Sequence, residues 1–222
     1  MMSKKLRTVC RRSQQPGYNA KAAAKMDSQE RKMSRVGSYS VIADTGEKLV
    51  EILRRGLVPE LIADPHGIGL ASPSERGDLS LGIWVYDIRE SEEIRVSGMQ
   101  SQGLDRQKYP PMYLTLYIML TAYSSSDIKF RAEQEQRILG KAMQLFYDNS
   151  VMPVPAGIDM RIEKISPEIH EQREIWNASD VPYRTSLFYR VTPVELESEK
   201  SRHVRRVTSI DMTVEEKERD HV

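Results

Sequence analysis

The chain has 222 residues, of which 29% are charged and 39% hydrophobic, and a formal net charge of +1. This length accommodates one sizeable domain or two small ones, and the low apolar content indicates polar segments attached to a normal core. The longest apolar run spans only Leu116 to Leu120, whereas a membrane-spanning helix needs about 20 such residues. Cys10 is the only cysteine, which excludes an internal disulfide and a cysteine-based zinc site and is typical of a reducing cytoplasm.

The first segment, residues 1–37, is strongly basic. Residues 1–36 carry ten lysines and arginines against Asp27 and Glu30, a net charge of +8, and the rest of the chain is −7. Such an arm can contact nucleic acid or an acidic protein surface, but Tyr18 is its only aromatic residue for base stacking. We therefore favour a solvated, disordered extension, or a start codon placed too far upstream, over nucleic-acid binding. No apolar run follows the basic residues as in a secretory signal.

The folded domain is expected to begin near Ser38. Apolar residues at helical spacing predict a helix over 39–55, with Gly56 as its C-cap. Prolines and glycines crowd residues 59–78, which indicates a long structured loop. Alternating residues predict a strand over 79–87, and the charged stretch 89–108 is expected to be a mobile connection.

The second half of the domain begins with the strongest strand pattern, over 112–123, which should form a hairpin with the strand before it. A helix follows, capped by Ser125 or Ser126 and ending near Tyr147. A short strand is expected over 158–165.

The triplet Ser166-Pro-Glu168 then predicts the start of a helix that buries Ile169, Gln172, Arg173 and Trp176. The last strand is expected over 183–192. The order α-β-β-α-β-α-β predicts a single α/β domain over 38–195, with helices packed on a mixed sheet.

Motifs that carry chemistry are missing from the sequence. It contains no phosphate-binding loop, no dinucleotide fingerprint after a strand and no His-Glu-x-x-His helix. His170 and Glu174 have the i,i+4 spacing of two metal ligands, but without a third ligand they are typical of a solvated helix face. We predict no catalytic residue, no metal site and no cofactor, and therefore a protein that is not an enzyme.

Aromatic side chains gather on the second face of the predicted sheet. They are Trp84, Tyr86, Tyr113, Tyr117 and Tyr123. If helices cover both faces of the sheet, these rings belong to the interior. The alternative is a protein–protein interface, where tyrosine and tryptophan are enriched. We name the five residues as candidate interface residues.

Four stretches of the sequence resemble a protein family found in the gene clusters of phage-tail-like contractile injection systems. They are Tyr39–Val50, Ser72–Leu81 running on to Tyr86–Glu90, Tyr109–Tyr117 with Leu120–Ser124, and Glu135–Gly140. They occur in the same order and with similar gaps, and the resemblance spans about 39–195. The family is the cap, or tail-terminator, protein, and the basic arm before Ser38 is not part of its pattern.

The resemblance implies a structural function. Tail terminators form a hexameric ring at the end of the tube and sheath opposite the baseplate, where the ring stops polymerisation and fixes the length. The implied partners are other copies of the chain and the tube and sheath proteins, with no membrane or nucleic acid. Assembly in the cytoplasm and release with the particle on lysis are also implied. The alternative function is a nucleic-acid-associated or regulatory α/β domain that binds phosphates through its basic arm.

The last segment, residues 196–222, is polar but contains a strand pattern. Ile210, Met212 and Val214 alternate with Asp211 and Thr213. A strand at a chain end needs a sheet edge, its own or a neighbour's. We expect about 203–214 to be a donated strand that augments an adjacent cap subunit or the last sheath ring, with a disordered tail as the alternative. Its candidate interface residues are Val204, Val207, Ile210, Met212 and Val214.

Overall fold

The computed structural model describes residues 39–102, 105–155 and 157–204. All of these residues belong to one compact unit. The basic segment and residues 205–222 lie outside the described residues, so the limits proposed for the two arms stay predictions.

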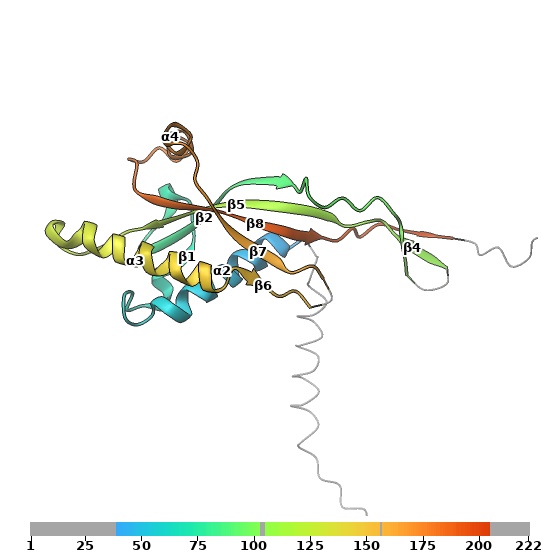
Figure 1. Ribbon diagram of the computed structural model, residues 1–222, viewed down its shortest axis with the longest axis horizontal. Coiled ribbons are helices and arrows are strands. Elements are labelled where there is room, and N and C mark those ends of the chain that lie inside the picture. Colours follow the sequence, from blue (N-terminus) through green and yellow to red (C-terminus); the bar gives the residue numbers. More distant parts are fainter. Residues whose placement is uncertain (1–38, 103–104, 156, 205–222) are drawn as a thin grey trace, which may run out of the picture. The chain divides into compact units, whose positions relative to one another are not determined.

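A six-stranded sheet with the order β1-β2-β5-β8-β7-β6 forms the centre of the fold (Figure 1). Its strands are β1 (Ile68–Leu70), β2 (Leu81–Glu90), β5 (Met112–Ala122), β6 (Val151–Met152), β7 (Met160–Ile165) and β8 (Ser186–Leu196). β1 runs parallel to β2, and every other pair is antiparallel. The mixed sheet and the hairpin of β2 with β5 confirm the prediction from the sequence.

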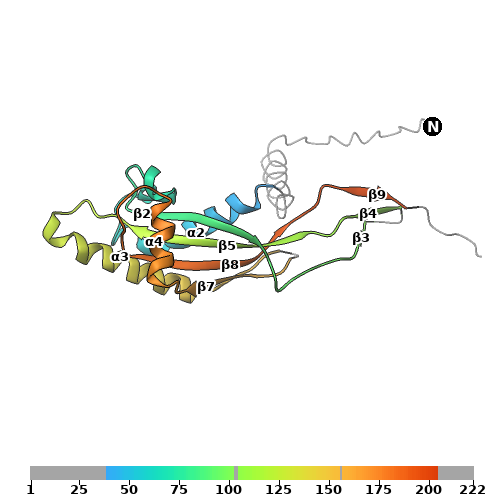
Figure 2. The same cartoon turned by 90° about the horizontal axis from the view of Figure 1, so that it is seen from above.

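Two long helices pack on one face of this sheet and a short helix packs on the other (Figures 1 and 2). α2 (Val41–Leu57) and α3 (Ile128–Asp148) bury their apolar stripes against the sheet, with Leu53, Leu57 and Ala142 fully enclosed. Burying one such leucine contributes about 1.5–3 kcal/mol, so this layer supplies most of the hydrophobic core. On the opposite face, α4 (Ile169–Asn177) buries Trp176 against Met119 and Phe188.

A three-stranded sheet, here called the ribbon, extends the hairpin of β5 and β8. It consists of β3 (Gln100–Ser101), β4 (Arg106–Lys108) and β9 (Ser201–His203), in the order β3-β4-β9. The Tyr109 N–H donates to the Lys200 carbonyl at 3.0 Å, where the ribbon joins the main sheet. Both views place the ribbon beyond the ends of β5 and β8 (Figures 1 and 2).

The long elements follow the predicted order, and the differences lie in short ones. Residues 59–78 contain β1 between two 3-10 turns, Pro65–Gly67 and Pro73–Glu75. The stretch 89–108, expected to be a mobile connection, forms β3 and β4. These strands have two or three residues, which is too short for a periodic pattern.

Several predicted helix ends were wrong. Gly56 is not a C-cap, because α2 continues to Leu57 and is capped by Val58. A Cβ on Gly56 would lie 2.3 Å from Cδ2 of Leu145, so the glycine permits the close approach of α2 to α3. The N-cap of α3 is Asp127 rather than Ser125 or Ser126.

The start and the buried face of α4 also differ from the prediction. Its N-cap is Glu168, whose backbone N–H donates a capping-box hydrogen bond to the Glu171 carboxylate at 2.8 Å. Ile169 and Arg173 are exposed, while Trp176 and Ile175 face the sheet.

Candidate functional site

α4 packs on the predicted aromatic face, where Trp176 and Ile175 lie in one apolar cluster with Trp84 and Tyr86. A β-bulge between Val85 and Asp87 places Tyr86 as an extra residue in β2. Its ring centre lies 6.2 Å from those of Trp84 and Tyr117 and 6.0 Å from that of Phe188. Burial, with a smaller effect of the Asp87 charge, raises the pKa of Tyr86 to about 12. Trp84, Tyr86 and Tyr117 are half-buried, so part of each ring stays accessible.

Beyond α4, the connection that follows β2 crosses the sheet (Figure 2). The Ser91 N–H donates to the Tyr113 carbonyl at 2.7 Å. Arg190 of β8 forms ion pairs with both the connection and the sheet. Its guanidinium lies 3.4 Å from the carboxylate of Glu93 in the connection and 2.6 Å from that of Glu163 in β7. Tyr113 is buried, and this burial raises the pKa of its hydroxyl.

Tyr123 belongs to a separate cluster at the end of β5. The guanidinium groups of Arg76 and Arg184 lie 4.5 and 5.5 Å from its ring centre. Glu135 pairs with Arg184 at 3.0 Å and accepts a hydrogen bond from the Ser124 N–H at 3.1 Å. Three of the stretches that resemble terminators therefore meet here, and their residues hold the 72–78 loop, β5 and α3 together.

The structure thus gives every predicted aromatic a contact within its own chain. It brings Trp84, Tyr86 and Tyr117 together and separates them from Tyr123. Val204 is half-buried, and its N–H donates to the Asp105 carbonyl at 2.9 Å. The other candidates in the C-terminal arm, Val207, Ile210, Met212 and Val214, lie outside the described residues. Contacts of these ten residues with another chain stay a prediction.

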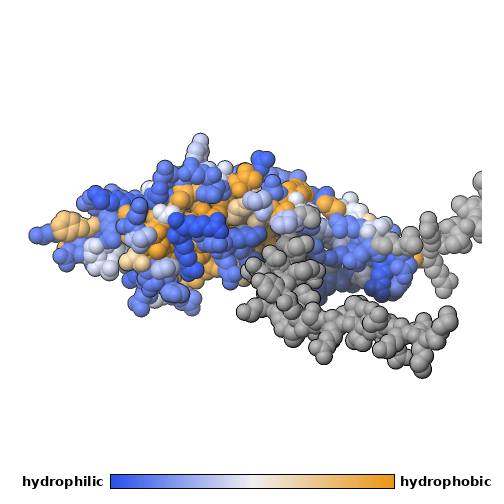
Figure 3. Space-filling view, turned by 90° about the horizontal axis from the view of Figure 1, so that it is seen from below, coloured by the Kyte–Doolittle hydropathy of each residue, from blue (hydrophilic) through white to orange (hydrophobic). Residues whose placement is uncertain are grey.

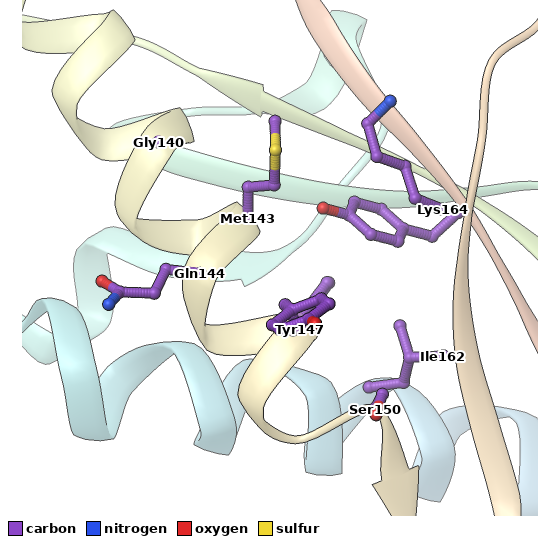
Figure 4. Close-up of a pocket in the computed structure, with 9 residues that line it drawn as sticks. Gly140, Met143, Gln144, Tyr147, Ser150, Ile162 and Lys164 are labelled. Atoms are coloured by element: carbon purple, nitrogen blue, oxygen red, sulfur yellow. The ribbon is translucent and has the colours of Figure 1, made fainter.

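A surface that the sequence did not indicate is a groove between α3 and β7, with a volume of about 420 Å³. Phe146 and Tyr189 are its most buried lining residues, and their rings pack edge to face at 5.1 Å. Met143 and Tyr147 lie on the helix side and Lys164 on the strand side (Figure 4). The groove surface is almost entirely apolar. Because Tyr147 is 83% exposed, this apolar surface is accessible to a partner.

The Tyr189 hydroxyl at this groove is unusual. It is buried and has no hydrogen-bond partner among the described residues. Burial raises its pKa to about 12, so the hydroxyl is neutral at physiological pH.

The groove adjoins an open sheet edge. β6 pairs with β7 only at Met160 and Arg161, and the Ser150 carbonyl accepts the Ile162 N–H at 2.8 Å. Beyond Ile162, no described strand pairs with the outer side of β7. An unpaired edge of this kind is a template for another strand.

The start of α3 is a second exposed apolar surface. Ile128 and Phe130 are 81% and 61% exposed, and the buried residues of the helix begin only at Ile138. Ile128 and Phe130 remain exposed because the first turns of α3 extend past the sheet (Figure 1). Figure 3 shows apolar surface among the polar side chains on the side where α2 and α3 lie.

The described residues contain no group of three or more histidine, cysteine, aspartate or glutamate side chains that could hold a metal ion. His170 lies 3.3 Å from Glu168 on the exposed start of α4. No helix in the described part of the chain is long and apolar enough to span a membrane.

Comparison with known proteins relates this fold to injection systems. The model of the Pvc16 N-terminal domain matches residues 44–210. The sheath/tube terminator of the PVC extracellular contractile injection system, solved in its extended state, is 19% identical with a TM-score of 0.58, over 79% of this chain and 64% of that chain. The tube-terminating cap of the anti-feeding prophage is 20% identical with a TM-score of 0.54, over 78% of this chain and 60% of that one. No curated protein matches the chain.

The chain spans less than two thirds of either solved terminator. The family match nevertheless covers well over half of the chain and includes the central sheet, the three helices and the ribbon. The resemblance to tail terminators that the sequence suggested is confirmed, and the chain belongs to the Pvc16 N-terminal domain family.

Proposed function

We propose that this chain caps the distal end of the tube and sheath of a contractile injection particle, as a hexameric ring that ends polymerisation and fixes the length. The observation that carries the proposal is the terminator fold, shared over nearly four fifths of this chain (79% and 78%) with a sheath/tube terminator and a tube-terminating cap. The tube and sheath proteins of the same particle are its expected partners. The role is structural and assigns the chain no catalytic residue.

The exposed surfaces support a ring. A closed ring joins one surface of each subunit to a different surface of the next. The start of α3 with Ile128 and Phe130 and the groove beside Met143 and Tyr147 are two unlike apolar surfaces without a cover among the described residues. Each subunit therefore offers the two kinds of contact that such an assembly requires.

The two arms have different places in the proposal. Residues 1–37 are an extension outside the terminator fold. Residues 203–214 donate a strand to the next cap subunit or to the last sheath ring. Assembly takes place in the cytoplasm, and the cap then remains part of the particle that is released on lysis.

Mass photometry of the purified chain, alone and with assembled tubes, tests the proposal. We expect hexamers, at least in the presence of tube, and rings on tube ends in electron micrographs. A chain that stays monomeric and ignores tube ends would contradict it. Steeply salt-dependent DNA binding that is lost on deletion of residues 1–36 would instead support the nucleic-acid alternative.

A further inference from the structure

We infer that the open edge of β7, together with the groove beside α3, accepts residues 210–214 of a second copy of the chain as an added strand. This inference rests on the ring proposed above and names the acceptor on the neighbouring subunit. It uses two features that have no partner among the described residues: the outer edge of β7 beyond Ile162 and the adjoining apolar groove.

The outer edge of β7 has the geometry to accept a strand. In an antiparallel strand, alternate residues direct their backbone N–H and C=O groups to the same side. The Ile162 N–H points to the outer side, where it binds the Ser150 carbonyl, so the backbone groups of Lys164 point outward as well. Lys164 is paired with Tyr189 of β8 on the inner side of β7. A strand placed outside Lys164 gains backbone hydrogen bonds and lies over the groove.

The sequence pattern of the C-terminal arm fits this edge. In an extended segment, the alternate residues Ile210, Met212 and Val214 would share one face. On an added strand, that face would turn toward the groove beside Met143 and Tyr147. Side chains of alternate residues in such pockets give strand addition its specificity.

Two lysines beside the groove favour an acidic partner strand. Lys141 donates to the amide oxygen of Gln144 and Lys164 to the Ser166 hydroxyl, both at 3.1 Å. Neither ammonium group pairs with a carboxylate among the described residues. The arm brings Glu216, which would share the groove-facing side with Ile210, Met212 and Val214 on an added strand. A carboxylate arriving beside these two lysines would complete an ion pair.

The length of the C-terminal arm selects a second copy of the chain as the donor. Tyr189 and Val204 are fifteen residues apart on β8, β9 and their extended junction, which corresponds to roughly 50 Å. The ten residues from Val204 to Val214 span at most about 36 Å when fully extended. The arm therefore cannot return to Lys164 of its own chain. In a ring, each subunit donates one arm and accepts another, which closes every β7 edge.

Disulfide cross-linking of the full chain tests this assignment. In a Cys10→Ser background, chains with Lys164→Cys are mixed with chains carrying Ile210→Cys, Met212→Cys or Val214→Cys, assembled on tubes and oxidised. Facing residues on neighbouring strands have Cβ atoms about 4.5–5.5 Å apart, close to disulfide geometry. We expect a covalent dimer with at least one of these three partners. The matched controls Asp211→Cys and Thr213→Cys place the thiol on the opposite face and should give at least tenfold less dimer.

The outcomes separate this inference from the proposed function. Capped tubes without any dimer, or equal dimer from the two control variants, would overturn the acceptor site and leave the capping role intact. An arm that cross-links to sheath protein instead would also overturn it. If no rings form on tubes at all, the capping role fails and the inference fails with it.

Discussion

Gly56→Ala should destabilise the protein, although alanine is the better helix former. In the interior of a helix, replacing glycine by alanine normally stabilises by about 0.5–1 kcal/mol. At Gly56, however, the new Cβ would lie 2.3 and 2.6 Å from the two Cδ atoms of Leu145. Carbon atoms pack at about 3.5–4.0 Å, so Leu145 must move by more than 1 Å.

The expected magnitude follows from these two opposing effects. Overpacking of a core typically costs about 1–3 kcal/mol. Leu145 is only partly buried and can move in part, so we expect a cost in the middle of this range. After subtraction of the gain in helix propensity, Gly56→Ala should lower the free energy of unfolding by about 1 kcal/mol.

The chain offers a matched control in α3. Gly140 is also inside a helix, but no atom lies within 4 Å of the position of its Cβ. Gly140→Ala should therefore stabilise by about 0.5–1 kcal/mol. Adding Leu145→Ala to Gly56→Ala should relieve the overlap, which a double-mutant cycle would show as coupling between the two sites.

Urea denaturation followed by circular dichroism measures all of these variants. We expect the two glycine substitutions to change the free energy of unfolding in opposite directions. If Gly56→Ala stabilises as much as Gly140→Ala, α2 and α3 are not in close contact at this point and the reasoning is wrong.

Three further predictions concern stability. Leu139→Asp should unfold the domain, because it buries an unpaired charge under α3; a normal melting curve would show that this face is exposed. Alanine at Glu133 or Arg137, an exposed pair, should change stability by less than about 0.5 kcal/mol. Glu135→Ala should cost about 1 kcal/mol, because it leaves Arg184 and the Ser124 N–H unpaired. Equal costs in the same urea assay would refute the cluster around Tyr123. Burial raises the pKa of Tyr189 to about 12, so the contribution of its neutral hydroxyl to the free energy of unfolding is complete below about pH 10 and is lost as the pH rises toward 12, by at most about 2.7 kcal/mol. Tyr189→Phe should flatten this alkaline loss and leave the stability at pH 7 unchanged or higher. A pH profile that is the same in the variant would contradict this prediction.

The long elements could be predicted because their patterns repeat over many residues. The alternation over 112–123 predicts a strand that the structure places at Met112–Ala122. β3 and β6 have two residues each, and no periodicity exists at that length. Gly56 has the local pattern of a C-cap, but in the structure it lies within α2 and contacts Leu145 of α3. Because Leu145 comes almost ninety residues later in the chain, a local sequence pattern could not predict this contact.

The site could be predicted only in part for a related reason. Alternation correctly placed Trp84, Tyr86 and Tyr117 on one face of the sheet. What covers that face depends on where α4 and the connection after β2 lie, which is a tertiary property. The groove combines Met143 and Tyr147 of α3 with residues of β7 and β8, so no single stretch carries its signal. Lys164, a charge at a core-facing position of a strand, is the one local sign of an open edge.

The most direct test of the capping role is the length distribution of the particles in electron micrographs, with the chain present and with its gene deleted. With the chain present, we expect particles of uniform length with a ring at the end opposite the baseplate. Deletion should give tubes and sheaths of variable length without that ring, and the full chain supplied in trans should restore uniformity. Particles of unchanged, uniform length that still carry the terminal ring after deletion would contradict the account.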